Sequence, residues 1–272
     1  GGDTGLNSTA LPFRADPSLA VVDGTLFAAW AEDASDNSGD AVYVAGHNGN
    51  DSSPSWDTMQ DLRYDTGKTG TFPDIVEYQG YLVAVWNEAD SIRARYYDPI
   101  DDDWNPLDTG SLHEHASGNV YGPEFAVVDG SLYLFWSEYG TNDAYQLRAR
   151  ALTGTLSSPS WSFVDEGKDT GLNYNTSADA RYPATASLHG QLYMASSEGA
   201  PRQMRARVFN GSISSSEWEF IDGESSDGLN WDPQQYNADF PALVSLEGAL
   251  YLAWSEASGG APAHEIRVMR GE

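Results

Sequence analysis

The sequence predicts an all-β protein, a five-bladed β-propeller with about four antiparallel strands in each blade. Three observations lead to this fold class. A unit of roughly 50 to 60 residues occurs five times, apolar residues alternate with a period of two inside each unit, and helical periodicity is found nowhere. Units of this length bury their faces against neighbouring units, and four strands covered on both faces are typical of a propeller blade.

The repeat is defined by fixed spacings from a proline. A glycine comes seven residues after each proline, a tryptophan or in one unit a serine comes thirteen after it, and a glutamate comes fifteen after it. The prolines are Pro17, Pro73, Pro123, Pro183 and Pro241. The glutamates are Glu32, Glu88, Glu138, Glu198 and Glu256. We expect one domain over residues 1–272, with blades starting near residues 10, 66, 115, 176 and 233.

The unit that begins at Pro123 shows the expected order of strands. An apolar first strand is followed by an X-Gly pair, a strong signal for a two-residue hairpin turn. The second strand is apolar on both faces, so we expect it to be covered on two sides. A third strand carries Arg at alternate positions, and a fourth begins with Trp. In order, these elements are Glu124–Val128, Asp129-Gly130, Ser131–Glu138, Leu147–Arg150 and the strand from Trp161.

The two ends of the chain suggest how the ring of blades closes. The last unit stops after its third strand, His264–Arg270, without the Trp that opens a fourth strand. The segment Asp3–Asn7 matches Asp169–Asn173, which follows a fourth strand. We therefore expect residues near 1–9 to lie against the last blade, which remains short or is closed by the N-terminus.

The composition excludes two classes of partner. The chain has 41 acidic residues against 14 Lys and Arg, a net charge of −27. Such a surface repels nucleic acid and anionic membranes, so we expect neither as a partner. It also suits a salty medium in which counterions screen the charge, so we expect a secreted protein of marine or halophilic origin, extracellular or on a cell surface. We expect a monomer or part of a larger multidomain protein.

The units resemble those of the tandem-repeat β-propeller lectins, a class that includes tachylectin-type five-bladed and fucose-binding six-bladed proteins. The resemblance rests on Leu132–Glu138 followed by Leu147–Arg150 and Trp161, and it covers the whole chain as architecture. Fucose-binding propellers use an Arg, a Glu and an aromatic residue in each site. This chain repeats those residue types, although its Glu ends the second strand. The resemblance implies a carbohydrate-binding, lectin-like module whose partner is a glycan, without specifying the sugar.

The repeated glutamates and the arginines of the third strands allow two interpretations. They form charge pairs that tie strands or blades together, for example Glu88 with Arg93 or Arg95, or they form one arm of a sugar site in each blade. We favour the first, because identical repetition is typical of packing. The arginines concerned are Arg93, Arg148, Arg205 and Arg267.

The predicted ligand face is formed by the loops that join second to third strands and fourth strands to the next blade. These loops differ most between units and combine aromatic rings with polar groups, which suits sugar stacking and hydroxyl hydrogen bonds. The predicted ligand-binding residues are Arg14, Tyr121, Arg181, Tyr182, Trp231 and Tyr236.

Two alternatives remain open. One is a glycoside hydrolase or lyase of the five-bladed type, but no Asp or Glu stands out from its repeat equivalents, so we predict no catalytic residue and lean away from an enzyme. The other is a protein-binding domain of a surface adhesin. We predict no cofactor and no metal site. The acidic loops Asp36–Asp40 and Asp101–Asp103 carry the oxygen ligands that Ca²⁺ prefers but do not fit the EF-hand pattern.

Overall fold

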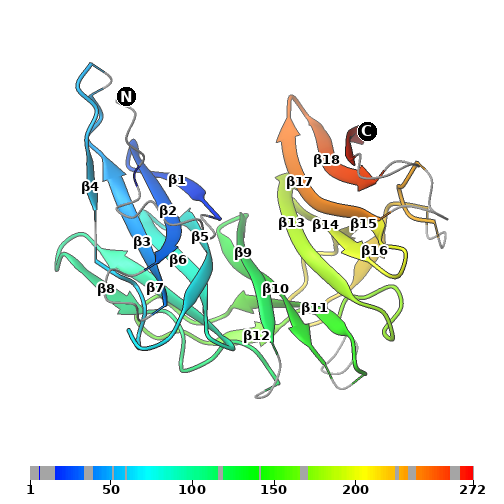
Figure 1. The fold of residues 1–272 in the computed structure, drawn as a ribbon, viewed down its shortest axis with the longest axis horizontal. Helices are drawn as coiled ribbons and strands as arrows, with labels where there is room; N and C mark the ends of the chain where they lie inside the picture. Colours follow the sequence, from blue (N-terminus) through cyan, green and yellow to red (C-terminus); the bar gives the residue numbers. More distant parts are fainter. Residues whose placement is uncertain are drawn as a thin grey trace. The chain divides into compact units, whose positions relative to one another are not determined.

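The computed structural model describes residues 6, 16–33, 39–50, 52–58, 60–115, 119–140, 142–165, 171–223, 227–231, 237–257 and 264–271. All elements in these ranges are strands, and they form five antiparallel sheets (Figure 1). The prediction of an all-β fold of the five-bladed propeller type is confirmed. None of the described elements is a helix of the length and apolarity needed to cross a bilayer.

The chain divides into two compact units, which are described separately. Unit 1 comprises Gly1–His113 with Gly154–Ser160, and unit 2 comprises Glu114–Thr153 with Trp161–Glu272. Unit 1 contains one sheet of β1 (Ser18–Val22), β2 (Thr25–Asp33), β3 (Asp40–His47) and β4 (Trp56–Thr58), and a second sheet of β5 (Gly70–Tyr78), β6 (Tyr81–Glu88), β7 (Ser91–Asp98) and β8 (Asp103–Pro106).

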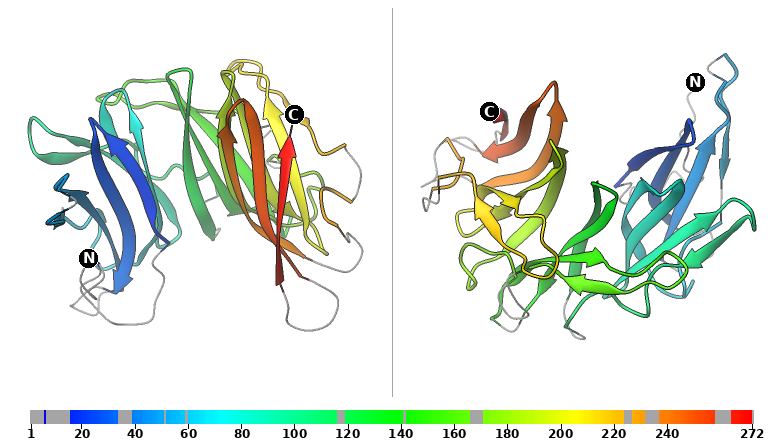
Figure 2. Two further views of the ribbon diagram at one scale, coloured as in Figure 1. Left: turned by 90° about the horizontal axis from the view of Figure 1, so that it is seen from above. Right: turned by 180° about the vertical axis from the view of Figure 1, so that it is seen from behind.

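Unit 2 contains the other three sheets, each again in chain order. They are β9 (Val120–Val128), β10 (Ser131–Tyr139), β11 (Tyr145–Leu152) and β12 (Trp161–Phe163); β13 (Ala180–Leu188), β14 (Gln191–Glu198), β15 (Gln203–Phe209) and β16 (Trp218–Phe220); and β17 (Ala238–Leu246), β18 (Ala249–Ala257) and β19 (His264–Gly271). Among the described residues the last sheet therefore has three strands, as predicted, and Figure 2 shows β19 at its edge. Of residues 1–9, predicted to close the ring, all but Leu6 lie outside the described part of the chain, so this prediction is untested.

Each X-Gly pair forms the predicted turn between the first and second strands. At Asp129-Gly130 both residues have positive φ, 48° and 71°. Two successive residues with positive φ define the type I′ turn, whose twist matches that of the strands it joins. The equivalent pairs are Asp23-Gly24, Gln79-Gly80, His189-Gly190 and Glu247-Gly248, all with positive φ at both residues.

The second strand of each sheet is the centre of its packing. In β10, Leu134, Phe135 and Trp136 are all fully buried, although consecutive side chains point to opposite faces. This confirms that the strand is covered on both sides. The equivalent tryptophans Trp30, Trp86 and Trp254 are also buried, as is Ser196, which takes the same place in β14.

A bulge lies at the start of the first strand, next to the repeated proline. The pairing register shifts between Arg181 and Ala184 in β13 and at matching places in β5 and β17. The residue before the proline takes positive φ, 56° at Tyr182, where a bulky side chain is uncommon. We call this end of the first strands the bulge end. It is the end opposite to the X-Gly turns.

Candidate functional site

The repeated glutamates lie buried and accept hydrogen bonds from the backbone. Glu138 is fully buried, and its carboxylate accepts the indole N–H of Trp136 at 2.8 Å. It also accepts the backbone N–H groups of Glu114, at 3.0 Å, and His115. These two residues belong to the segment that enters β9. The carboxylate therefore holds that entering segment against the second strand of the same sheet.

The same arrangement recurs at Glu88, Glu198 and Glu256, whereas the indole N–H of Trp30 in β2 has no hydrogen-bond partner among the described residues. Glu88 accepts the indole N–H of Trp86 at 3.0 Å and the backbone N–H of Tyr64 at 2.8 Å. Where serine replaces tryptophan, the Ser196 hydroxyl donates to Glu198 at 2.8 Å, so the shorter side chain keeps the bond. The repetition of one bonding pattern supports the packing interpretation of the glutamates.

The entering segment is also bonded to the preceding sheet. The backbone N–H of Leu172 donates to the carbonyl of Leu147 in β11 at 2.8 Å, and the neighbouring Tyr174 N–H donates to Glu198 in β14 at 2.7 Å. One short segment thus joins two consecutive sheets of unit 2. The Leu and Asn of the Thr-Gly-Leu-Asn repeat both bond β11. The Leu172 N–H donates to Leu147, and the Asn173 side chain accepts the Leu147 N–H.

In β7, β11 and β15 the first arginine pairs with an aspartate and not with the repeated glutamate, unlike one of the two expected pairings, that of Glu88 with Arg93. Arg93 instead lies 3.1 Å from Asp108, the acid four residues after the fourth-strand Trp104. Arg148 and Asp165 repeat this ion pair with an Nε–Oδ2 distance of 2.6 Å. The aspartate lies at the end of the adjacent strand, and in the first case it also accepts the Ala94 N–H at 2.8 Å.

Two arginines do reach the glutamates. Arg207, the second arginine of β15, lies 2.6 Å from Glu198. Arg267 lies in the last sheet, where no fourth strand is described, and its Nε is 3.8 Å from Glu256. Arg205 lies 2.8 Å from Asp222, which makes a third arginine–aspartate pair like those of Arg93 and Arg148. Arg148, Arg205 and Arg207 are buried with their partners, whereas the side chains of Arg93 and Arg267 are 21% and 32% exposed.

Two predicted ligand-binding residues, Tyr121 and Arg181, come together at the bulge end of unit 2. The guanidinium of Arg181 lies 4.0 Å from the ring centre of Tyr145 and 6.0 Å from that of Tyr121. Tyr139 packs edge-on against Tyr145 with ring centres 5.2 Å apart. Asp179 accepts a hydrogen bond from Arg181 at 2.9 Å. We call these five residues the tyrosine cluster.

The tyrosine cluster is ordered by the backbone beneath it and open at its surface. Asp179 also accepts the backbone N–H of Tyr145 at 2.9 Å, which fixes its carboxylate, and Tyr145 is 8% exposed. Burial raises the pKa of the Tyr145 phenol. The Tyr139 residue is 37% exposed, and the side chains of Arg181 and Asp179 are 32% and 38% exposed. These three groups are accessible to a ligand.

A second ion pair and a ring pair continue the bulge end next to the tyrosine cluster. Arg202 bonds Asp239 through two nitrogens, each 2.5 Å from a carboxylate oxygen. This bond raises the pKa of Arg202, and the nearby Tyr182 and Asp179 add to the effect. Tyr182 and Arg181, predicted in a loop, lie instead in β13 at its bulge, because the first strand begins before the repeated proline. The Tyr182 ring packs on Phe240 with centres 4.7 Å apart. The surface is continuous because β13 is packed beside β9 and β17.

The remaining predicted residues are not brought into this surface. Trp231 is 79% exposed; its backbone N–H donates to Glu256 at 3.0 Å, and the Arg267 guanidinium lies 5.6 Å from its ring centre. Arg14 and Tyr236 lie outside the described residues. Conversely, Asp179 and Asp239 were missed. The repeated proline could have identified both aspartates, because the residues two to four positions before each proline lie at the bulge.

The described residues offer no cluster of three or more His, Asp or Glu side chains suited to a metal ion. In the acidic loop Asp101–Asp103, the Asp102 carboxylate accepts the hydroxyl of Tyr97 and Asp103 accepts the amide of Gln60 at 3.3 Å. Most of the other acidic loop, Asp36–Asp40, lies outside the described ranges.

Comparison of the fold with solved structures finds glycosidase propellers at low sequence identity. The α-L-arabinanase of Penicillium chrysogenum, solved with arabinobiose, matches with a TM-score of 0.59 and 14% identity over 92% of this chain and 80% of that chain. The endo-arabinase of Bacteroides thetaiotaomicron matches with a TM-score of 0.54 and 14% identity over 96% and 95%. The GH93 α-L-arabinofuranosidase of Fusarium graminearum, solved with arabinobiose, matches with a TM-score of 0.60 and 13% identity over 93% and 80%.

At such identities these matches show the fold alone. No protein-family model matches the sequence, and no curated protein matches it. The similarity to propeller lectins expected from the repeats is therefore supported at the level of propeller architecture, while the three structures compared above are those of glycosidases.

Proposed function

We propose that this protein is a carbohydrate-active propeller that engages a neutral saccharide at the bulge end of unit 2. The observation that carries the proposal is the tyrosine cluster, where the exposed ring of Tyr139 packs on Tyr145 beside the exposed Arg181–Asp179 ion pair. Aromatic faces stack on the apolar face of a sugar ring, and a paired guanidinium and carboxylate offer both donors and acceptors to its hydroxyls.

The comparisons support a glycan as the ligand class. Two of the structures that share this fold were solved with arabinobiose. Arabino-oligosaccharides are therefore the first ligands to test here, although the low identity carries no information about the residues of a site. The strongly acidic chain favours a neutral sugar over an anionic one, because an anion would be repelled.

The binding test compares two double variants of the full chain. Tyr139→Ala with Arg181→Met removes an accessible ring and the cation of the tyrosine cluster. Tyr251→Ala with Arg270→Met removes another tyrosine and arginine, a cross-strand pair of β18 and β19 in the same unit. Calorimetric titration with arabinobiose and a glycan array should show about tenfold weaker binding, roughly 1.4 kcal/mol, for the first variant. Equal binding by both variants would remove the tyrosine cluster from the proposal.

A glycoside hydrolase is the second candidate, and the comparisons favour it over binding without turnover. Hydrolysis needs one carboxyl group as acid and another as base or nucleophile. At the bulge end of unit 2, Asp239 bonds Arg202, Asp179 is close enough to act on the pKa of Arg202, and Glu124 lies on β9. The Glu124 carboxylate accepts the backbone N–H of Thr185 at 2.8 Å, a bond that positions it between β9 and β13.

The release of reducing sugar from arabinan tests this candidate. If the protein is a hydrolase, Asp179→Asn or Asp239→Asn should lower the rate by about 10²- to 10⁴-fold, the range of acid–base catalysis, while saccharide binding persists. Glu219→Asn, at an exposed acid of β16, is the control. If the unmodified chain binds the saccharide without hydrolysing it, the hydrolase candidate is excluded and the binding module is supported.

Two further expectations stay predictions. An extracellular or cell-surface setting follows from the acidic composition, and localisation of the tagged full-length protein would test it. The adhesin alternative predicts binding to proteins or cells that free sugars do not inhibit. Competition of whole-cell binding by arabinobiose would separate that alternative from a glycan ligand.

A further inference from the structure

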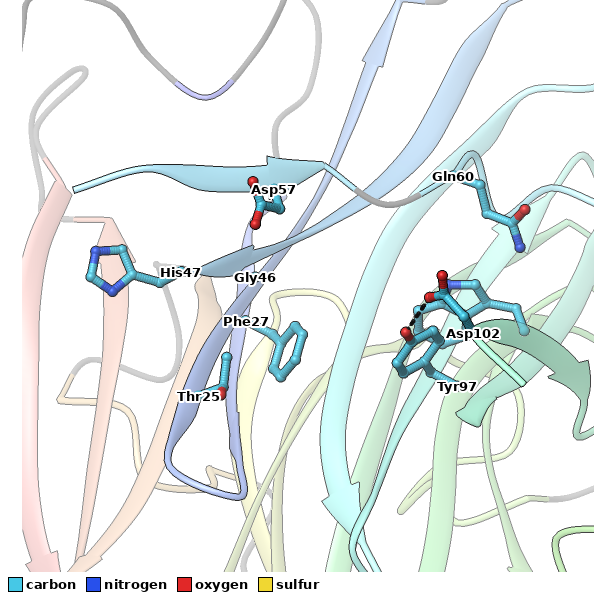
Figure 3. A pocket seen from close by; sticks show the side chains of 9 residues that line it. Thr25, Phe27, Gly46, His47, Asp57, Gln60, Tyr97 and Asp102 are labelled. Carbon is cyan, nitrogen blue, oxygen red and sulfur yellow. Dashed lines mark hydrogen bonds between the residues drawn. The ribbon is translucent and has the colours of Figure 1, made fainter. Parts of the chain in front are cut away.

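A second candidate site lies in unit 1, at the turn end of the strands. A cavity of about 490 Å³ is lined by residues of the β1–β4 sheet and of the β5–β8 sheet. Figure 3 shows Phe27, from β2, and Asp57, from β4, on one side of it. Tyr97 and Asp102, joined by a hydrogen bond, face them from the other sheet. Binding pockets for small ligands commonly have volumes of about 300 to 1,000 Å³.

Three aromatic rings give the cavity an apolar lining. Phe27 lies on one sheet, while Tyr97 and Trp104 lie on the other with ring centres 5.6 Å apart. Gly46 makes room for the Phe27 ring, because a Cβ at this position would lie 3.1 Å from its Cε1 atom. The glycine is part of the lining, so a larger residue here would push the ring toward the cavity.

The polar groups of the lining include both hydrogen-bond donors and acceptors. Asp57 and Asp102 supply exposed carboxylates. The Nδ1 atom of His47 accepts the Gly49 N–H at 3.2 Å, so the neutral ring carries its proton on Nε2. Trp104 is 5% exposed, and its buried indole N–H finds no hydrogen-bond acceptor among the described residues.

This combination selects among ligand classes. An anion would meet two carboxylates and no Lys or Arg in the lining. A cation would use the carboxylates and rings but would leave the N–H groups of His47 and Trp104 without a role. A sugar hydroxyl both donates and accepts, and a sugar ring has an apolar face that stacks on aromatic rings. A neutral saccharide is the ligand that uses every group.

We propose that this cavity binds one ring of a neutral saccharide, as a glycan site additional to the tyrosine cluster. The inference shares its ligand class with the proposed function but rests on the lining of the cavity alone. Two glycan sites on one chain would raise the avidity for a polysaccharide, because the second contact becomes intramolecular once the first has formed.

Ligand-observed saturation-transfer NMR on the full chain tests the proposal with arabinobiose, xylobiose and cellotriose as probes. The background is the Tyr139→Ala, Arg181→Met variant, in which the tyrosine cluster is disabled. To it are added Gly46→Ala, which displaces Phe27, or Asp57→Asn, which removes one carboxylate of the cavity. Trp56→Phe is the matched control, because the Trp56 ring packs at a tilt against His47, with centres 5.1 Å apart, without lining the cavity.

We expect at least one probe to bind in the background variant, to weaken about tenfold on Gly46→Ala or Asp57→Asn, and to remain unchanged on Trp56→Phe. Thermal unfolding of each variant verifies that the fold is intact. The absence of transfer from all three probes in the background variant, at about 10 mM where a millimolar site is occupied, would overturn the cavity site and leave the proposed function untouched. Binding of tetramethylammonium in place of the sugars would overturn the ligand class.

Discussion

At the scale of single residues, the repeated charged side chains stabilise the sheets. Glu138, Arg148 and Asp165 are each almost completely buried, and each has charged or backbone partners at hydrogen-bond distance. A buried charge without partners costs several kcal/mol, so identical partners recur wherever the charge recurs. The saccharide chemistry is instead found at positions that differ between sheets, such as Tyr121 and Arg181.

The first prediction concerns the buried glutamate of β10. Glu138→Gln should lower the free energy of unfolding by about 2 to 3 kcal/mol, because an amide offers one acceptor oxygen to the N–H groups of Trp136, Glu114 and His115. Urea denaturation measures the change. Glu219→Gln, at an exposed position, is the control and should be nearly neutral. A similar stability of both variants would show that the carboxylate is not structural.

The second prediction concerns alkaline pH. Burial raises the pKa of Tyr64 to about 12, and its hydroxyl donates to the carbonyl of Ala94 at 3.0 Å. The unfolded phenol ionises near pH 10, so the stabilisation is complete below about pH 10 and is lost as the pH rises toward 12. Tyr64→Phe should therefore flatten the fall in melting temperature between these two pH values.

The control for this measurement is Tyr193→Phe, since the hydroxyl of Tyr193 donates to the nearby Gln191 side chain in an exposed hydrogen bond. It should leave the alkaline profile unchanged. An equally steep profile for Tyr64→Phe and the unmodified chain would contradict the argument.

At the scale of elements, turns and bulges fix the strands of each sheet in register. The X-Gly turns require positive φ at two successive residues, and the bulges at the other end of the first strand place positive φ on Phe72, Tyr182 and Phe240. The bulge adds one residue to the first strand, which changes the direction of its side chains. As a result Arg181 and Tyr182 reach the surface that we propose binds a saccharide, while Asp239 lies buried beneath it and bonds Arg202.

The third prediction tests the turn. Gly130→Ala should destabilise the fold by about 1 to 2 kcal/mol, because φ is +71° there and a left-handed backbone is costly for a residue with a Cβ. No atom lies within 4 Å of the added Cβ, so packing does not contribute. Asp129→Asn, which tolerates the same backbone region, should be nearly neutral by chemical denaturation. A neutral Gly130→Ala would contradict the type I′ turn.

The fourth prediction tests the second strand. Trp136→Ala should lower the free energy of unfolding by about 3 to 5 kcal/mol through the cavity that it leaves. Trp136 is fully buried, packs near Phe163 with ring centres 6.3 Å apart, and loses its bond to Glu138 as well. Ser196→Ala, at the equivalent place of β14, removes one hydroxyl and should cost much less. An equal cost for the two variants would contradict this account.

At the scale of the whole molecule, the acidic composition dominates. The 41 acidic residues exceed the 14 Lys and Arg, and several of the arginines are already paired inside the sheets. The remaining carboxylates repel one another, which opposes the compact state.

The fifth prediction follows from this repulsion. The melting temperature should rise as NaCl is increased from near zero to about 1 M, since the Debye length falls from tens of ångströms to about 3 Å. Calorimetry in a salt series measures it, and sucrose at matched osmolality is the control. A constant or falling melting temperature would show that the acidic residues are already dispersed or paired.

The sequence alone determined the fold class, the strand order, the turns and the buried tryptophans. These features depend on local backbone geometry and on a period of two, which a single sequence contains. Asp129-Gly130 identifies its own turn, and Trp136 identifies its own strand.

The tertiary structure decided which charges pair and where a ligand can bind. The pairing of Arg93 with Asp108 in place of Glu88 depends on which strand end lies nearest, a distance that repeat spacing does not contain. Tyr121 and Arg181 are 60 residues apart and meet because two first strands pack side by side. The cavity between Phe27 and Tyr97 likewise exists only once two sheets face each other, because its surface belongs to neither repeat by itself.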